Sequence, residues 1–228
     1  MAGMFASVGI LAAVRHQIQT GEGQFIDIGM LDTHVAWLAN QGMNYLSTDK
    51  NPERLGNQHP NIVPYQVMPT SDGYIVLSVG NDPTFERFCK LAGEEKLIND
   101  PKFKTNADRV SNRELVTKVL NEITKKHTSE WWLEELEKEK IGCGPINTLS
   151  QVFSDPHVKA REMIVNMDHK KTGKSPLKLI ANPIKMHETP PSYRMPPPLL
   201  GEHTDEILSE EIGLSETEIK NLKNNEII

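Results

Sequence analysis

Apolar residues recur at helical spacing over the first twenty positions of the chain. They are Met4, Val8, Ile10, Leu11, Val14 and Ile18. This spacing predicts a helix over residues 4–19, and the scarcity of polar residues before Gln17 predicts that it is buried on most sides. The helix should end at Thr20-Gly21, because glycine suits the left-handed position after a helix.

The pattern then changes to alternation. In "QFIDIGM", residues 24–30, apolar and other side chains alternate, which predicts a strand. A second helix, roughly residues 32–45, should follow with Val35, Trp37 and Leu38 facing inward. Helix, strand and helix in this order indicate one piece of a βαβ layer. A parallel sheet needs several such units, so we expect its other strands to lie outside this chain.

The middle of the chain, about residues 60–180, predicts a compact α+β module. "DGYIVLSV" is the clearest strand, and it follows an Asp-Gly turn. In the next helix Asp82 should cap, Pro83 should occupy the first position, and Gly93 should end the element. Two further helices are expected at about 111–126 and 129–140.

Turn residues dominate the rest of the chain. "IGCGPINTLSQVFSDP" should be turn-rich and lead into a short helix that Asp155-Pro156 stops. Residues 162–186 predict a β-hairpin whose turn is "KKTGKS", residues 170–175. A proline-dense linker follows, and Ser215 with Glu218 forms a capping box.

Composition narrows the class of protein. The chain has 228 residues, 37% of them hydrophobic and 25% charged, as in soluble globular proteins. A net charge of −6 argues against a nucleic-acid-binding protein. Cys89 and Cys143 are isolated, which favours a reducing compartment. The apolar run before Arg15 is too short to span a bilayer. We therefore expect a cytoplasmic protein, or an organellar-matrix (mitochondrial) protein if the source is eukaryotic.

Familiar catalytic motifs are missing or incomplete. "GEGQFI" lacks the third glycine of a dinucleotide fingerprint, there is no G-x-S-x-G elbow, and the scattered histidines predict no metal site. Asp27 and Asp32 flank a predicted strand end, where α/β sites lie. The favoured alternative is structural: Asp32 caps a helix, and Asp27 points outward from the strand. The loop "RLGNQHPNIVPYQ" suits close approach of a ligand, although a plain connector remains equally open.

Four ordered blocks carry a resemblance. They are "GILAAVRHQIQTGEGQFIDIGMLD", "ERLGNQHPNIVPYQVMPTSDGYIVLSVGND", "GCGPINTLSQVFSDPHVKAREMI" and "PPLLGEHTDEIL". Together they resemble CoA-transferase family III (CaiB/BaiF type), which includes formyl-CoA and carnitine CoA-transferases and α-methylacyl-CoA racemases. The likeness extends over essentially all 228 residues. "LGNQHPNIVPYQ" is most similar to the succinate/dicarboxylate type.

The resemblance implies an α/β fold class and a division of the chain. Residues 1–45 would be the end of a large Rossmann-like domain with its connecting helix, and 46–185 a small α+β domain. Residues 186–228 would be a proline-rich linker and helices returning to the large domain. Two such chains would form an interlocked dimer; the alternative partner is a complementing N-terminal half.

The resemblance also implies a chemistry. An aspartate attacks acyl-CoA to give an acyl-aspartyl anhydride, then a thioester of CoA with the enzyme carboxylate, which a carboxylic acid acceptor resolves. That aspartate should lie upstream of Met1, so no catalytic residue is assigned here, and neither Asp27 nor Asp32 replaces it. CoA and acyl-CoA are substrates, with no metal, nucleic-acid or membrane partner expected.

Two groups of site residues follow from the same resemblance. The substrate loop corresponds to Leu55–Pro60, with Gly56, Asn57, Gln58 and His59 as its site residues. Thr70, Ser71 and Asp72 correspond to a segment near the adenine end of CoA. The alternatives to a transferase are an α-methylacyl-CoA racemase-like fragment and a non-catalytic remnant or interaction module.

Overall fold

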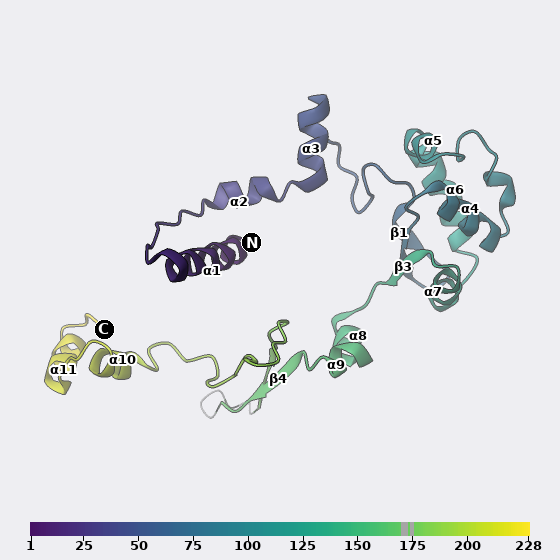
Figure 1. The fold of residues 1–228 in the computed structure, drawn as a ribbon. Coiled ribbons are helices and arrows are strands. Elements are labelled where there is room, and N and C mark those ends of the chain that lie inside the picture. The colour runs from purple at the N-terminus through teal and green to yellow at the C-terminus, as the bar shows by residue number, and fades with distance from the viewer. Residues whose placement is uncertain (170–172, 174–175) are drawn as a thin grey trace. The chain divides into compact units, whose positions relative to one another are not determined.

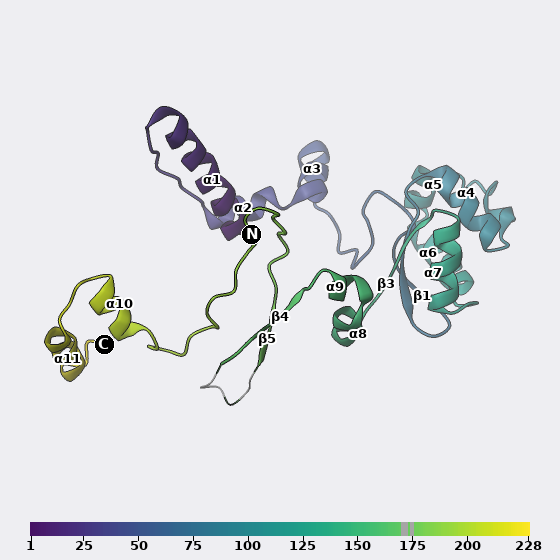
Figure 2. The same cartoon turned by 60° about the horizontal axis from the view of Figure 1, so that its bottom comes forward.

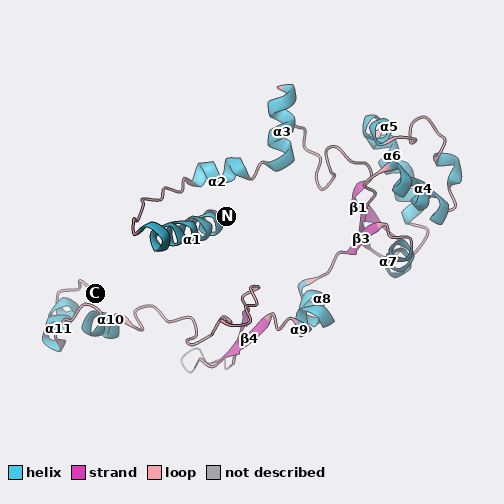
Figure 3. Ribbon diagram, viewed as in Figure 1, coloured by secondary structure: helices cyan, strands magenta, loops and turns pink. Residues whose placement is uncertain are grey.

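The structure, a computed structural model, describes residues 1–169, 173 and 176–228. The chain divides into two compact units, residues 1–146 and 147–228. Figure 1 follows the chain through both, and Figure 3 shows that the strands are confined to a few short stretches among helices and loops. Each unit is described by itself.

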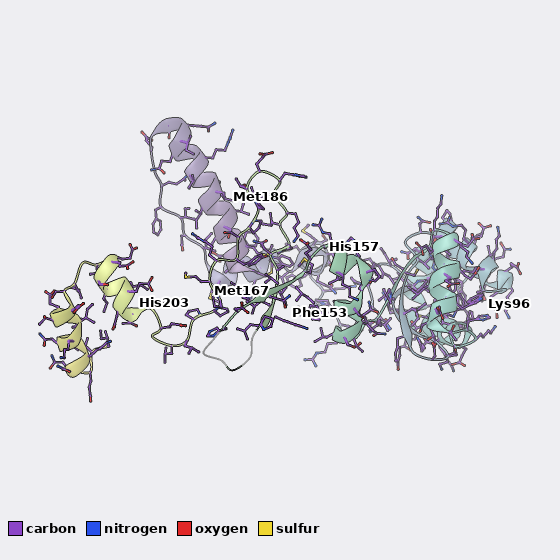
Figure 4. The ribbon with its side chains drawn as sticks, turned by 90° about the horizontal axis from the view of Figure 1, so that it is seen from below. Lys96, Phe153, His157, Met167, Met186 and His203 are labelled. Carbon is purple, nitrogen blue, oxygen red and sulfur yellow. The ribbon has the colours of Figure 1, made fainter. Side chains whose placement is uncertain are left out.

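The first predicted helix is present, but its burial is wrong. Helix α1 spans Ala2–Thr20 and ends at Gly21, whose φ of 80° is left-handed. No residue of α1 is buried, and Leu11 and Ile18 are 69% and 80% exposed. Figure 4 shows the side chains of both units as sticks. Apolar spacing therefore predicted the helix correctly, but the described residues do not bury it.

The predicted strand at residues 24–30 is absent, and residues 22–29 are irregular. A strand needs a second backbone to complete its hydrogen bonds, and none of the described segments pairs with this one. The helix expected at 32–45 is two helices, α2 (Met30–Ala36) and α3 (Ala39–Thr48). They are separated where Ala39 adopts a positive φ of 48°. Trp37 and Leu38, expected to face inward, are more than half exposed, as is Val35.

A three-stranded antiparallel sheet organises the rest of the first unit. Strands β1 (Tyr65–Pro69), β2 (Tyr74–Ser78) and β3 (Gly142–Pro145) lie in the order β1-β2-β3. The prediction of β2 is confirmed, whereas β3 had been expected to be turn. Its glycine has a packing reason: a Cβ at Gly142 would lie 3.1 Å from the backbone oxygen of Ser78. Close approach to β2 thus requires the residue type that suggested a turn.

Helices complete a single core on this sheet. They are α4 (Asp82–Leu91), the 3-10 helix η1 (Glu95–Leu97), α5 (Asn106–Ser111), α6 (Arg113–Thr124) and α7 (Ser129–Lys138). Helix α6 packs on β1, and α7 on β2 and β3 (Figure 2). The core joins Met68, Ile75 and Leu77 of the sheet to Leu120 and Trp132 of these helices, whereas Lys96 lies at the surface (Figure 4). The alternate apolar residues of the strands thus pack against the apolar faces of the helices in a single core.

The start of α4 corrects a capping prediction by one residue. Asn81 is the N-cap, and its Oδ1 accepts a hydrogen bond from the backbone N–H of Thr84 (2.9 Å). Asp82 is instead the first helical residue, and Pro83 is the second. Gly93 follows the helix with a φ of 67°, as predicted. The shift leaves the Asp82 carboxylate available for a different contact, described below.

The second unit contains short elements. They are α8 (Leu149–Ser154), α9 (Pro156–Ala160), β4 (Ile164–Met167), β5 (Leu177–Ile180), α10 (Thr204–Glu210) and α11 (Glu216–Asn224). Antiparallel pairing of β4 with β5 confirms the predicted hairpin. Residues 170–172 and 174–175 of its predicted turn lie outside the described residues. Asp155 does more than stop α8, because it also caps α9. The capping box of Ser215 and Glu218 is confirmed.

Candidate functional site

The predicted substrate loop, Leu55–Pro60, lies immediately before β1. Its turn is made at Gly56, which has a φ of 61° and open space where a side chain would be. The backbone N–H of Gln58 donates to the Leu55 oxygen (3.1 Å), which closes the turn. Glycine is suited to this conformation because other residues are strained there.

Asn57 and His59 occupy the free edge of β1. Asn57 Oδ1 accepts from the backbone N–H of Val67 (2.9 Å), and the His59 N–H donates to the Tyr65 oxygen (2.9 Å). The His59 ring also stacks on Tyr65, with centroids 5.4 Å apart. Its Nδ1 accepts from the N–H of Asn61 (3.1 Å), so the ring proton belongs on Nε2. Both side chains are therefore engaged in holding the loop to the sheet.

Arg113, at the start of α6, also holds this loop in place. Its guanidinium donates to the backbone oxygens of His59 (2.9 Å) and Pro60 (2.6 Å). A longer contact of 3.4 Å reaches Oε1 of Gln58. Burial lowers the pKa of Arg113 from its ordinary value, although not enough to remove the charge at neutral pH. The loop is thus anchored in its C-terminal part, which follows the turn at Gly56.

The segment that joins the loop to β1 is held by α5. Asn106 bonds both Asn61 and Val63. Arg109, which is fully buried, donates to the backbone oxygen of Val63 (2.7 Å) and to Asp82 Oδ1 (2.9 Å). Further Arg109 bonds reach the Phe103 and Lys104 oxygens, and the guanidinium lies 4.3 Å from the ring centre of Phe85.

Sequence reasoning missed Arg109, Arg113 and Asn106 altogether. Helical spacing gave no signal for Arg109, because it lies on the short helix α5 whereas Val116 and Leu120 belong to α6. A buried arginine must find acceptors, and the irregular backbone at Val63 supplies one of them.

A cleft of about 960 Å³ opens between the loop and α6. The loop contributes Glu53, Arg54, Leu55 and Gln58. The opposite wall, from the end of α5 through α6, contributes Val110, Ser111, Asn112, Arg113, Glu114, Leu115, Thr117, Lys118, Asn121 and Glu122. Of the four predicted loop residues, Gln58 alone lines this cleft.

Thr70, Ser71 and Asp72 lie at the opposite end of β1. Asp72 Oδ1 accepts from the backbone N–H of Ser129 (2.8 Å), from its hydroxyl (3.0 Å) and from Thr70 Oγ1 (3.0 Å). The backbone bond from Ser129 is the main reason why the pKa of Asp72 is lowered. Ser71 donates its backbone N–H to the His127 oxygen (3.0 Å). These contacts tie the β1–β2 turn to the start of α7.

The structure therefore does not bring the two predicted groups together. Asn57 is bonded to Val67 in the middle of β1, and the three positions from Val67 to Thr70 correspond to roughly 10 Å at about 3.3 Å per residue.

The other candidate residues do not form a catalytic or metal-binding group in the described part of the chain. Asp27 and Asp32 are exposed, and Asp32 is not the cap of α2, which is Gly29. Burial raises the pKa of the Cys89 thiol to about 12, so it is not a thiolate nucleophile at neutral pH. Within residues 1–169, 173 and 176–228, no group of three His, Cys, Asp or Glu side chains could hold a metal ion. Across the same residues, no helix combines the length and apolar character that crossing a bilayer requires.

Comparison with known proteins identifies the family. The model of CoA-transferase family III matches residues 1–204. This chain belongs to CoA-transferase family III. It is 40% identical over 208 residues to succinate–glutarate CoA-transferase of Agrobacterium fabrum, covering 91% of this chain and 52% of that protein. It is 37% identical over 208 residues to human succinyl-CoA:glutarate CoA-transferase, covering 91% of this chain and 47% of the relative.

Solved structures of this family III chain's relatives confirm the predicted α/β fold class. A CaiB/BaiF family protein of Brucella suis superposes with a TM-score of 0.70 at 38% identity, over 92% of this chain and 53% of that one. A Mycobacterium tuberculosis protein gives a TM-score of 0.72 at 24% identity, covering 89% of this chain and 53% of that one, and shows the fold alone. The family III chain spans about half the length of the curated relatives that it matches.

Proposed function

We propose that this chain contributes the substrate loop to an enzyme that moves CoA between an acyl-CoA and a dicarboxylic acid. The observation that carries the proposal is its 40% identity to a protein named succinate–glutarate CoA-transferase. Relatives named for succinyl-CoA with glutarate or mesaconate as acceptor point to the same substrate class. Dicarboxylates are therefore the acceptors to test first.

In this proposal the loop serves as the cover of the reacting groups. Its anchored part, held by Asn57 and Arg113, fixes where the cover is attached, and its turn at Gly56 supplies the motion. Excluding water matters because an acyl-aspartyl anhydride and an enzyme thioester are both open to hydrolysis. Gln58 is the predicted site residue of the loop that lines the cleft, and it is proposed to face substrate.

The nucleophilic aspartate is proposed to come from polypeptide other than these residues. It belongs to the part of a family III enzyme that these residues do not match. The Thr70–Asp72 turn is proposed to approach the adenine end of CoA. Its role there is limited to surface contact, since the bonds of Asp72 and Thr70 already hold α7.

Reconstitution tests the function. The chain is mixed with the half of the Agrobacterium relative that it does not match, and CoA transfer from succinyl-CoA to glutarate is followed by mass spectrometry. We expect transfer in the mixture and none with either piece alone. Transfer by the chain alone would show that the nucleophile is among its own residues. Epimerisation of a 2-methylacyl-CoA without transfer would instead favour the racemase alternative, and neither activity would favour a remnant.

A further inference from the structure

The cleft between residues 53–58 and α6 has more hydrogen-bonding capacity than the free protein uses. Asn121 Oδ1 is buried and has no hydrogen-bond partner. Gln66, which is 5% exposed, is reached by Thr117 Oγ1 only at the long distance of 3.5 Å. The contact of Gln58 Oε1 with Arg113 is similarly long at 3.4 Å. Buried polar groups in native proteins are nearly always satisfied, so the unpartnered Oδ1 of Asn121, a residue that lines the cleft, indicates that a ligand completes its hydrogen bonding.

The charged residues that line the cleft indicate the charge of a ligand that fits it. The cleft is lined by three cations and three anions: Arg54, Arg113 and Lys118, and Glu53, Glu114 and Glu122. This balance gives no net attraction for an anion such as a phosphate or a free carboxylate. The Arg113 guanidinium is already engaged by the His59 and Pro60 oxygens. An uncharged ligand therefore fits this cleft better than a charged one.

The uncharged groups of the cleft narrow the chemistry further. Side-chain amides of Gln58, Asn112 and Asn121 line it together with the Thr117 hydroxyl. A side-chain amide presents an N–H donor and an oxygen acceptor, which is the complement of a secondary amide in a ligand. Leu55, Val110 and Leu115 add apolar surface beside these groups. The combination suits a chain of amides that also carries branched aliphatic carbon.

We propose that this cleft binds an uncharged chain of secondary amides, through Asn121 and Gln58. Resting on the proposed function, we identify the occupant as the pantetheine arm of the CoA substrate. That arm has two secondary amides and a gem-dimethyl group. An amide N–H of the arm donates to Asn121 Oδ1, and the methyl groups pack against Leu55 and Leu115. In this arrangement α6 is part of the substrate site, and the loop contacts the other side of the ligand.

Nuclear magnetic resonance of the full chain tests the proposal. Pantetheine at millimolar concentration is titrated into the ¹⁵N-labelled protein, and ADP is titrated separately as a probe for the nucleotide end of CoA. We expect pantetheine to shift the side-chain amides of Asn121 and Gln58 and the backbone of both cleft walls. ADP should leave these resonances in place.

Substitution of Asn121 provides the decisive comparison. Because Oδ1 has no partner in the free protein, Asn121→Ala should leave the unfolding temperature unchanged while weakening pantetheine binding about fivefold to tenfold. Asn225→Ala is the matched control. Asn225 also lies at a helix end, where its amide donates to the Asn221 oxygen, and this change should not alter affinity.

Several results would overturn the cleft assignment. They are an absence of shifts with pantetheine, shifts confined to residues outside the cleft, equal shifts with ADP, or unchanged affinity in Asn121→Ala. Failure of the proposed function is distinguishable from these. A reconstituted enzyme without CoA transfer, together with pantetheine still bound at Asn121, would refute the transferase while supporting the amide-binding cleft.

Discussion

At the scale of single residues, Arg109 has the largest predicted effect on stability. Its guanidinium is completely buried and is matched by backbone oxygens, by Asp82 and by the face of Phe85. Arg109→Met should lower the free energy of unfolding by about 3–5 kcal/mol, because it leaves buried acceptors and a carboxylate without their donor. Urea unfolding followed by tryptophan fluorescence measures this, since Trp132 belongs to the same core.

Arg161→Met is the matched control for this change. Arg161 ends α9, is exposed, and has no side-chain bond in the described part of the chain. Its substitution should alter the unfolding midpoint little. Equal stability of the Arg109 and Arg161 variants would mean that the guanidinium network of Arg109 contributes nothing net.

Asp72 gives a stability contribution that depends on pH. Its folded pKa is lowered, chiefly by the backbone N–H of Ser129, so the carboxylate form stabilises the folded state. The contribution is complete above the unfolded value of about 3.9 and is lost as pH falls through the lower folded value. Asp72→Ala should therefore be less stable than the parent at pH 7, and the difference should shrink in acid.

Thermal unfolding at a series of pH values tests this sign. Asp27→Ala is the control, because Asp27 is exposed and no hydrogen bond or ion pair of its side chain is present among the described residues. A stability difference for Asp72→Ala that stays constant down to the lowest pH would show that the lost contact is not one of the ionised carboxylate.

At the scale of elements, the loop before β1 protects a sheet edge. Strand β1 is at one edge of the sheet, and Asn57 Oδ1 takes the Val67 N–H that would otherwise face outward. Asn57→Ala should expose that N–H and accelerate its hydrogen exchange, while the core remains folded. Exchange measured by nuclear magnetic resonance at Val67 tests this. Gln58→Ala, one residue on, should leave the rate unchanged; acceleration in both variants would indicate loosening of the whole loop.

Elements whose partners lie nearby along the chain could be predicted from the sequence. The β4–β5 hairpin and the Ser215 capping box each depend on contacts within about twenty residues. The predictions failed where strand formation depends on pairing with a segment that is distant in sequence. Residues 24–30 have strand alternation but no described partner, and Gly142–Pro145 has turn composition but pairs with β2 across 64 to 70 positions of sequence. The bonds of Arg109 to Val63 and of Arg113 to His59 and Pro60 were missed for the same reason, because these backbone oxygens are 46 to 54 residues away in sequence.

At the scale of the whole molecule, the sequence resemblance supplied what local patterns could not. Ordered blocks such as "LGNQHPNIVPYQ" specified the family, which the match over residues 1–204 shows. Local patterns could not have identified the cleft at α6, because its walls are separated by more than fifty residues. The resemblance placed a loop there, and only the structure shows which of its side chains face inward and which hold the sheet.

The first 48 residues carry apolar surface that this chain does not bury. Val8, Leu11 and Ile18 of α1 are 68%, 69% and 80% exposed, and Phe25 is 92% exposed. Apolar surface of this extent promotes association. The isolated chain should therefore self-associate with rising concentration and bind a hydrophobic dye. A Val8→Gln, Leu11→Gln, Ile18→Gln variant should show less of both in analytical ultracentrifugation and dye fluorescence.

The core at residues 63–141 provides the control within the same molecule. Because α1 contributes no residue to that core, the triple variant should keep the parent's unfolding midpoint monitored at Trp132. If the variant instead unfolded more easily, α1 would have to pack on the core in solution. If it associated as strongly as the parent, the surface responsible would be elsewhere, with α2 and α3 next to test because Leu31 and Leu46 are also exposed. The expected result, a monomer with an intact core, would show that Val8, Leu11 and Ile18 of α1 mediate the self-association.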